Sequence, residues 1–130
     1  MKTAKELLVA YLDNVKDLDV VASLFAEDGI LELPYLASLG VEPSHQGPEN
    51  ITSFLKAVIN TVEDFKFHDL KIFMETEDSI FAEYRIDTTV LKSGKGFNQH
   101  YMGRLVAENG KIKLLREALD TAQTIKSDIF

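Results

Sequence analysis

The period of the hydrophobic pattern changes once along the chain, near residue 64, and this change limits the folds that the chain can adopt. Before it, apolar residues recur three or four positions apart, which is typical of one face of an α-helix. The clearest such stripe comprises Ile51, Phe54, Leu55, Val58, Ile59 and Val62. After it, apolar and polar residues alternate, which is typical of half-buried β-strands. The alternating segments are 65–76, 79–91, 97–107 and 111–119. Helices followed by a run of strands predict an α+β protein.

Local signals predict three helices before the strands. Thr3 and Glu6 have the spacing of a capping box at the start of the first helix. Asp17 or Asp19 can cap a second helix, which Gly29 would end. The third helix contains the stripe that ends at residue 62, and it follows a proline, which is favoured at a first helical position.

Turn residues between the alternating segments predict an antiparallel sheet of four to six strands. Asn109-Gly110 is a strong signal for a two-residue hairpin. We expect a further short strand at 30–33, an irregular loop at 35–47 and a short helix within 121–130. A curved sheet wrapped over three helices forms a cone that is open at one end.

Composition excludes several classes of function. The 130 residues and 45% hydrophobic content suffice for one domain, 1–130. The absence of cysteine excludes disulfides and thiol catalysis, and a net charge of −7 disfavours nucleic-acid binding. No segment resembles a signal peptide or a membrane span, so we expect a cytoplasmic protein. The three histidines lack the spacing of a metal site, and no cofactor motif occurs. The prediction is a pocket without metal or cofactor.

Two stretches resemble a known superfamily. AYLDNVKDLDVVASLFAEDGILELP resembles the opening of ketosteroid-isomerase-like and SnoaL-like proteins of the nuclear-transport-factor-2-like superfamily. FNQHYMGRLVAENGKIKLLREALDT resembles the phenazine-biosynthesis A/B branch. The resemblance implies a cone-shaped α+β domain that binds a small hydrophobic organic ligand and forms a homodimer through the outer face of its sheet. Because this fold hosts isomerases, cyclases, dehydratases and non-enzymes, it implies little about the reaction.

Two positions depart from the ketosteroid isomerases. Leu33 stands where the resemblance places the proton-shuttling aspartate, and Met102 where it places the protonated aspartate of the oxyanion hole. Tyr11 matches their tyrosine donor, although it can equally be a core aromatic. The steroid isomerase mechanism is therefore not expected.

The acid/base carboxylate of the phenazine branch is kept, but its partners are not. Phe54 and Val58 stand where the resemblance places a histidine and a serine. Glu117 matches the acid/base glutamate. The phenazine condensation is thus not expected, while proton transfer by a carboxyl group is.

The strand 111–119 leaves open which of its faces lies inside. Arg116 and Glu117 must point in opposite directions, because side chains alternate along a strand. Their two faces have similar apolar content. The resemblance favours Glu117 inside, with Leu115 and Leu119 on the same face. Residues Leu114, Arg116, Ala118 and Asp120 would then lie in the dimer interface, together with Arg85 and Asp87.

The same reasoning assigns the remaining pocket residues. Alternation predicts Tyr84, Ile86 and Thr88 inside on the strand 79–91. On 97–107, we expect Asn98, His100, Met102 and Arg104 to point inward, with Arg104 reaching the rim of the pocket. His100 can equally be a structural histidine. The predicted catalytic residues are Glu117, His100, Tyr11 and Tyr84. The predicted ligand-binding residues are Leu31, Leu33, Phe54, Val58, Ile86, Thr88, Asn98, Met102, Leu115 and Leu119.

Two hypotheses for the function follow. The first is a small cofactor-independent enzyme that moves a proton on a hydrophobic, oxygenated molecule, as in isomerisation, cyclisation or dehydration. Glu117 would be the acid/base, and hydroxyl or imidazole groups would hold a developing oxyanion. The second is a ligand-binding or scaffold dimer without chemistry, because both isomerase aspartates are missing. Room for a ligand beside Glu117 favours the first, and a filled cone the second.

Overall fold

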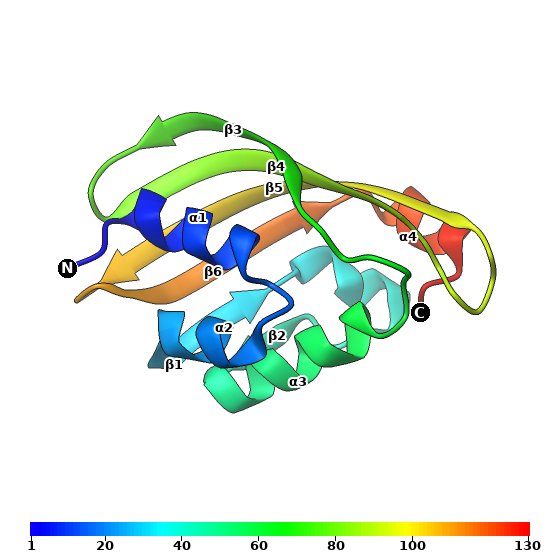
Figure 1. Cartoon of the computed structure of the whole chain (residues 1–130), viewed down its shortest axis with the longest axis horizontal. Coiled ribbons are helices and arrows are strands. Elements are labelled where there is room, and N and C mark those ends of the chain that lie inside the picture. Colours follow the sequence, from blue (N-terminus) through cyan, green and yellow to red (C-terminus); the bar gives the residue numbers. More distant parts are fainter.

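A computed structural model describes all residues, 1–130, and shows a curved, unclosed sheet of six strands with five helices (Figure 1). In chain order the elements are α1 (Ala4–Asp13), α2 (Leu18–Leu24), β1 (Phe25–Glu32), the 3₁₀ helix η1 (Pro34–Leu39), β2 (Ser44–Gln46), α3 (Pro48–Ile59), β3 (His68–Glu75), β4 (Ser79–Thr89), β5 (Gly96–Glu108), β6 (Lys111–Leu119) and α4 (Thr121–Ser127). The predicted α+β class is confirmed.

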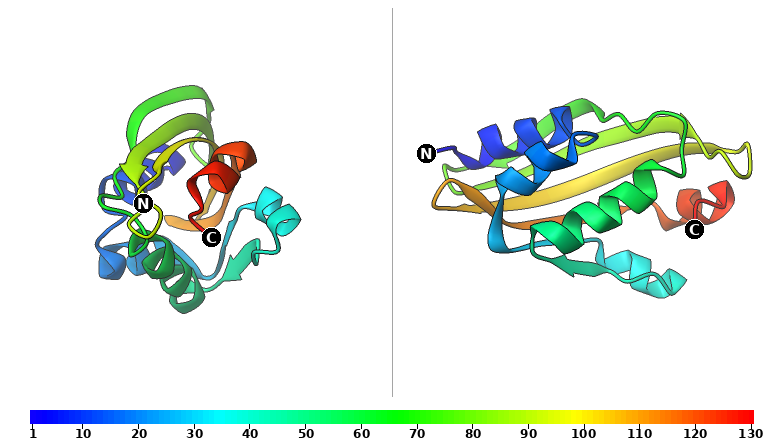
Figure 2. Two further views of the ribbon diagram at one scale, coloured as in Figure 1. Left: turned by 90° about the vertical axis from the view of Figure 1, so that its right-hand side faces the viewer. Right: turned by 60° about the horizontal axis from the view of Figure 1, so that its bottom comes forward.

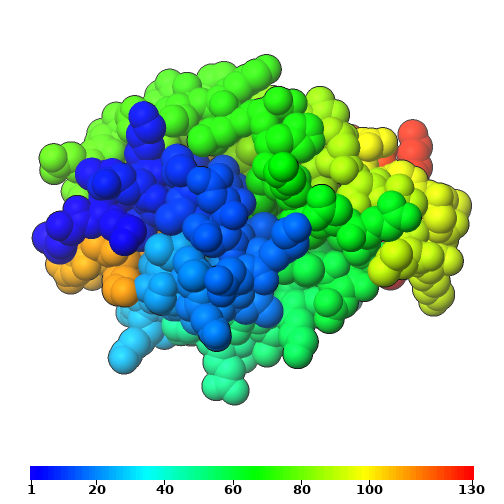
Figure 3. Space-filling view, viewed as in Figure 1, coloured from blue at the N-terminus to red at the C-terminus, as the bar shows by residue number.

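The strand order is β2-β1-β6-β5-β4-β3, and only the pairing of β1 with β6 is parallel. The sheet curves around α1, α2 and α3, which cover its inner face, while α4 lies at one end (Figure 2). In the space-filling view the blue atoms of α1 and α2 lie directly against the green atoms of β3 and α3 (Figure 3). A core of 29 buried hydrophobic residues fills the space between the layers. None of the helices has the length and apolarity that crossing a membrane requires.

The capping signals at the first two helices are confirmed. Thr3 Oγ1 accepts from the Glu6 amide at 3.2 Å, and Glu6 Oε1 accepts from the Thr3 amide at 3.0 Å. Asp17 accepts from the Val20 amide at 3.3 Å at the start of α2. These three hydrogen bonds occupy amides that have no partner within their helices.

The predicted end of the second helix at Gly29 is wrong. The helix α2 ends at Leu24, because Phe25 already pairs with Ile112 of β6 as the first residue of β1. Gly29 lies inside this strand, where a Cβ would stand 2.6 Å from the Ile112 carbonyl oxygen. The glycine therefore permits close approach of two strands instead of ending a helix.

The predicted loop 35–47 is largely regular. It contains η1 and the short strand β2, which pairs with β1 so that Leu31 faces His45. This pairing satisfies backbone groups on an edge of β1 that the sheet would otherwise leave open. The predicted strand 111–119 agrees with β6 at both ends.

The predicted register of β5 is wrong by one residue. Tyr101 lies directly opposite Tyr84 on β4, and directly opposite residues share a face, so Tyr101 is inside. His100 lies opposite Arg85 and is exposed on the outer face. The other predicted inward residues of this strand, Asn98, Met102 and Arg104, are also exposed on the outer face. The sequence of β5 itself favours the observed register, because Phe97, Tyr101, Leu105 and Ala107 share the inner face, whereas the outer face carries Asn98, His100 and Arg104.

Gln99 joins β5 to the start of α4. Its side chain is fully buried, and its Nε2 donates to the Asp120 carbonyl and to Thr124 Oγ1, both at 3.0 Å. Its Oε1 accepts from the Asp120 amide at 2.7 Å and from the His100 amide at 3.1 Å. The amide therefore has every hydrogen-bonding position filled, and it holds α4 against one end of the sheet.

We predict that Gln99→Leu lowers the free energy of unfolding by about 2 kcal/mol, because the Asp120 amide loses its acceptor and the buried Thr124 hydroxyl loses its donor. Urea denaturation of the two proteins measures this difference. Asn98→Leu, one residue earlier and exposed on the outer face, is the control and should change stability little. Equal stability of Gln99→Leu and the wild type would contradict this role for Gln99.

Candidate active site

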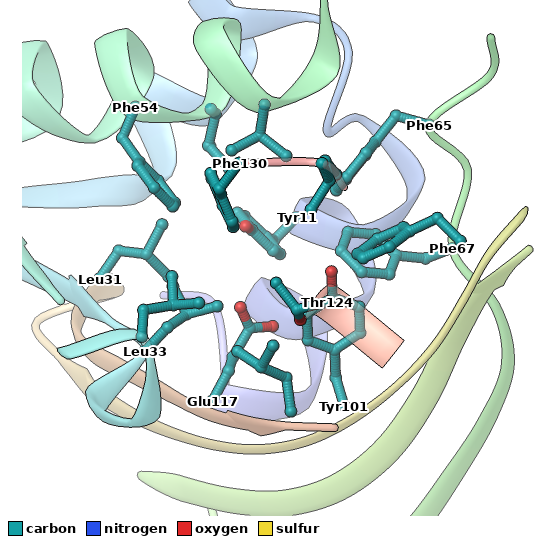
Figure 4. Close-up of a pocket in the computed structure, with 16 residues that line it drawn as sticks. Tyr11, Leu31, Leu33, Phe54, Phe65, Phe67, Tyr101, Glu117, Thr124 and Phe130 are labelled. Carbon is teal, nitrogen blue, oxygen red and sulfur yellow. The ribbon is translucent and has the colours of Figure 1, made fainter. Parts of the chain in front are cut away.

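A cavity with mainly apolar walls lies between the inner face of the sheet and the helices (Figure 4). Of the 16 residues that line it, 14 are hydrophobic. They come from α1, β1, η1, α3, β5, β6, α4 and the segments that precede β3 and follow α4. The lining consists of Tyr11, Leu31, Leu33, Leu36, Phe54, Leu55, Val58, Phe65, Phe67, Phe97, Tyr101, Glu117, Leu119, Thr124, Ile129 and Phe130.

Glu117 is the only residue with a carboxyl side chain in this lining. Its side chain is only 3% exposed, and its carboxyl group points from β6 into the cavity (Figure 4). Burial raises the pKa of Glu117 to about 7, because the charged form loses its hydration; the hydrogen bond from Tyr84 opposes this shift. A carboxyl group with this pKa is present in both protonation states at neutral pH.

Three tyrosines surround Glu117. The Tyr84 hydroxyl on β4 donates a hydrogen bond to Oε2 of Glu117. Tyr11 on α1 and Tyr101 on β5 are also buried, and the rings of Tyr84 and Tyr101 stack with centroids 5.9 Å apart. Burial, and then the negative charge of Glu117, raise the pKa of each of the three hydroxyls. All three therefore stay protonated and can act as hydrogen-bond donors.

Phe67, in the segment before β3, packs against all three tyrosines. Its ring meets Tyr84 edge-on at 5.3 Å and Tyr101 at 5.6 Å between centroids, and it lies 6.1 Å from Tyr11. Such edge contacts are favourable arrangements of aromatic rings. The aromatic cluster restricts the rotamers of the tyrosines and keeps water away from the carboxyl group.

The structure brings together three of the four predicted catalytic residues. Tyr11 and Tyr84 lie beside Glu117, whose inward position agrees with the expected register. His100 does not belong to this group, because its side chain lies on the opposite face of the sheet.

The predicted ligand-binding residues divide into three groups. Those that line the cavity are Leu31, Leu33, Phe54, Val58 and Leu119. Ile86 and Leu115 are fully buried in the core without lining the cavity, and Thr88 is half-buried and accepts a hydrogen bond from the Asp64 amide at 3.1 Å. Asn98 and Met102 are exposed on the outer face, because β5 has the opposite register to the one expected.

The sequence reasoning missed Tyr101 and the end of the chain. Tyr101 could have been found by pairing β4 with β5, since it faces Tyr84. Ile129 and Phe130 line the cavity although they lie beyond the last strand, and no sequence signal places them there. The structure contains no group of three or more His, Asp or Glu side chains placed to hold a metal ion.

The empty space inside the cavity is small. It measures about 30 Å³, which is room for about two water molecules. Pockets for small organic ligands usually measure roughly 300 Å³ or more. A ligand therefore needs some of the lining to move, and Phe130 is the lining residue with the most freedom to do so, because 55% of its surface is exposed.

Comparison with known proteins identifies the family. Residues 8–115 match the model of the SnoaL-like domain, and the chain belongs to this family. None of the curated proteins matches the sequence significantly.

Solved structures share the fold across nearly the whole chain. A provisionally named isomerase from Bacillus subtilis is 20% identical with a TM-score of 0.85, and the match covers 96% of this chain and 91% of that one. A phenazine biosynthesis-related protein from Pseudomonas aeruginosa is 20% identical with a TM-score of 0.80, with 95% and 83% covered. TerC, co-crystallised with polyporic acid, is 17% identical with a TM-score of 0.80, with 95% and 96% covered. At these identities the likeness establishes the fold alone.

The raised pKa of Glu117 predicts a pH dependence of stability. The folded protein binds the proton of Glu117 more tightly than the unfolded chain does. The contribution of this group to the free energy of unfolding is therefore fully present below pH 4.5 and is lost as the pH rises through about 7. The interval of about 2.5 pH units corresponds to about 3 kcal/mol. Glu117→Gln lacks this titration, so we expect its free energy of unfolding to exceed that of the wild type by roughly this amount at pH 8.

Urea denaturation of both proteins at pH 4.5, 6 and 8 measures the effect. The difference between the variants isolates Glu117, because every other group titrates in both. Parallel stability curves across this range would contradict the raised pKa.

Proposed function

We propose that this protein is a cofactor-independent enzyme that moves a proton on a hydrophobic, oxygenated small molecule. The observation that carries the proposal is a buried carboxyl group, Glu117, with a pKa of about 7 in a mainly apolar cavity beside three hydroxyl donors. Isomerisation, cyclisation and dehydration all require such a proton transfer. The common fold with TerC, which was crystallised with polyporic acid, supports a small organic ligand.

In the proposed reaction, the Glu117 carboxylate removes a proton from a carbon next to a carbonyl group. The electron pair of the broken C–H bond moves into the carbonyl, whose oxygen becomes negatively charged. Tyr11 and Tyr101 donate hydrogen bonds to this oxygen. The protonated Glu117 then returns the proton to another atom of the ligand, which regenerates the carboxylate.

The pKa of Glu117 suits both halves of this cycle. A carboxylic acid with an ordinary pKa is a weak base and holds its proton poorly at neutral pH, whereas one near 7 can both take and give a proton. Tyr84 has a different task in the proposal: its bond to Oε2 orients the carboxyl group and leaves Oε1 for the reaction.

We predict that Glu117→Gln abolishes turnover and keeps ligand binding, because the amide preserves the shape of the side chain but cannot accept the proton. A substrate-independent assay is the exchange of deuterium from D₂O into the acidic C–H positions of a panel of cyclic and aromatic ketones, followed by NMR. Wild-type protein should accelerate exchange for at least one ketone at least 100-fold more than the variant does.

The matched control for this assay is Glu75→Gln, which makes the same change at an exposed position of β3. It should retain wild-type exchange. If Glu117→Gln and wild type exchange a bound ketone at the same rate, Glu117 is not the base.

The second candidate function, a non-catalytic ligand-binding or scaffold dimer, is favoured by the small empty volume of the cavity. Replacement of Phe130 by alanine separates the two functions, because removal of this ring should enlarge the cavity at its most exposed wall. An enzyme whose cavity opens at Phe130 should bind the ketone panel more tightly after the change. A scaffold should show binding by neither protein, and a non-catalytic binding protein should bind the ketones without accelerating their deuterium exchange.

We also propose that two copies associate through the outer face of the sheet, which no helix of the chain covers. Polar groups there, such as Arg85 with its buried and unpaired Nε and Arg116 with its contact to Glu32 at 2.6 Å, surround the apolar Leu114 and Ala118. An uncovered sheet face of this kind is commonly buried in a two-fold interface.

For this assembly we predict a mass by light scattering of twice 14.6 kDa. Ala118→Glu places a charge at the centre of the outer face and should yield monomers, whereas Glu75→Gln should leave the mass of the dimer unchanged. A monomeric wild type at all accessible concentrations contradicts the proposal.

A further inference from the structure

Gly103 lies in the strand next to Glu117, directly opposite it. The paired positions across three strands are Ala82 on β4, Gly103 on β5 and Glu117 on β6. All three are buried on the inner face of the sheet. Gly103 therefore adjoins Glu117, the small Ala82 lies on the other side of Gly103, and the inner surface has a notch beside Glu117.

The backbone of β5 does not require a glycine at this position. Gly103 is absent from the residues with positive φ, so every amino acid could adopt its conformation. What requires glycine is space. A Cβ built on Gly103 would overlap the Tyr84 hydroxyl oxygen and would stand 3.0 Å from Cζ and 3.1 Å from Cε1 of the same ring. Its three nearest neighbours all belong to Tyr84.

Tyr84 reaches Glu117 through this notch. Tyr84 pairs with Tyr101, two residues before Gly103, and its side chain leans across Gly103 toward β6. There its hydroxyl makes the hydrogen bond to Oε2 of Glu117, the only one that this carboxyl group receives. Since Tyr84 is 1% exposed and stacked on Tyr101, the ring has little room for another position.

We propose that Gly103 is a positioning residue: its missing side chain creates the space in which the Tyr84 hydroxyl sits, and it thereby orients the carboxyl group of Glu117. The orientation of Glu117 by Gly103 matters for catalysis only if Glu117 is the acid/base, so this part rests on the proposed function. The geometric part, that Gly103 permits the Tyr84–Glu117 hydrogen bond, is independent of any activity.

The test is the titration of Glu117 by carbon-detected NMR in the full-length protein, without a ligand. Donation by Tyr84 favours the charged form of Glu117, so loss of this hydrogen bond raises the pKa. Tyr84→Phe should move the midpoint of the titration upward by roughly one pH unit. Gly103→Ala should move it in the same direction by a similar amount, because the added methyl group displaces the hydroxyl.

The double variant shows whether the two changes act through the same contact. In Gly103→Ala combined with Tyr84→Phe, the midpoint should equal that of Tyr84→Phe alone. The control is Gly96→Ala in the same strand, where a Cβ would meet only the flexible Asn98 side chain at 3.3 Å; it should leave the midpoint unchanged. A merely structural loss of stability would not reproduce this pattern.

If Gly103→Ala is too unstable to titrate, the same clash is measured through stability. Tyr84→Leu removes the hydroxyl oxygen and both ring atoms that the new methyl group would meet. In that background Gly103→Ala should lower the urea midpoint by less than half of what it does in the wild type. A clash with other atoms would lower both midpoints equally and overturn the proposal.

The proposal is also overturned if Gly103→Ala folds and leaves the Glu117 midpoint at its wild-type value, or if its effect adds fully to that of Tyr84→Phe. Either result is separable from failure of the proposed function. If the protein exchanges no ketone but shows the predicted titrations, Gly103 positions the carboxyl group of Glu117 although this group catalyses no reaction.

Discussion

The structure depends on one burial: the carboxyl group of Glu117 lies among apolar and aromatic side chains with a single hydrogen bond, from Tyr84. Removing a carboxylate from water is unfavourable, and here the result is a pKa of about 7. Burial of the large apolar core offsets the unfavourable free energy of burying this carboxyl group. The site thereby gains a group that can exchange protons at neutral pH.

The elements around Glu117 each contribute to keeping it in this state. The helix α1 brings Tyr11 across the inner face, β4 and β5 bring Tyr84 and Tyr101, and the segment before β3 inserts Phe67 among them. These side chains come from positions far apart in the sequence. The surroundings of the carboxyl group are thus a product of the curvature of the sheet and not of any one motif.

This arrangement explains how a family member can lack the isomerase aspartates and still have a site. Leu33 lines the apolar wall of the cavity, and Met102 lies on the outer face of the sheet. In the proposed function, the acid/base lies on a different strand, β6, and the hydrogen-bond donors beside it are tyrosines. The SnoaL-like fold therefore determines the position of the cavity more strictly than it determines which chemical groups line that cavity.

The sequence by itself determined the elements that rest on neighbours in the chain. Asn109-Gly110 forms the turn before β6, and the Thr3–Glu6 capping box starts α1. Only the tertiary structure decided which face of β6 is inside, because its two faces have similar apolar content and the choice depends on cross-strand pairing with β5. The same holds for the notch at Gly103: a glycine in a strand has no local meaning until another strand brings a tyrosine against it. Period and capping are interactions over a few residues, whereas the site is made by contacts across the sheet.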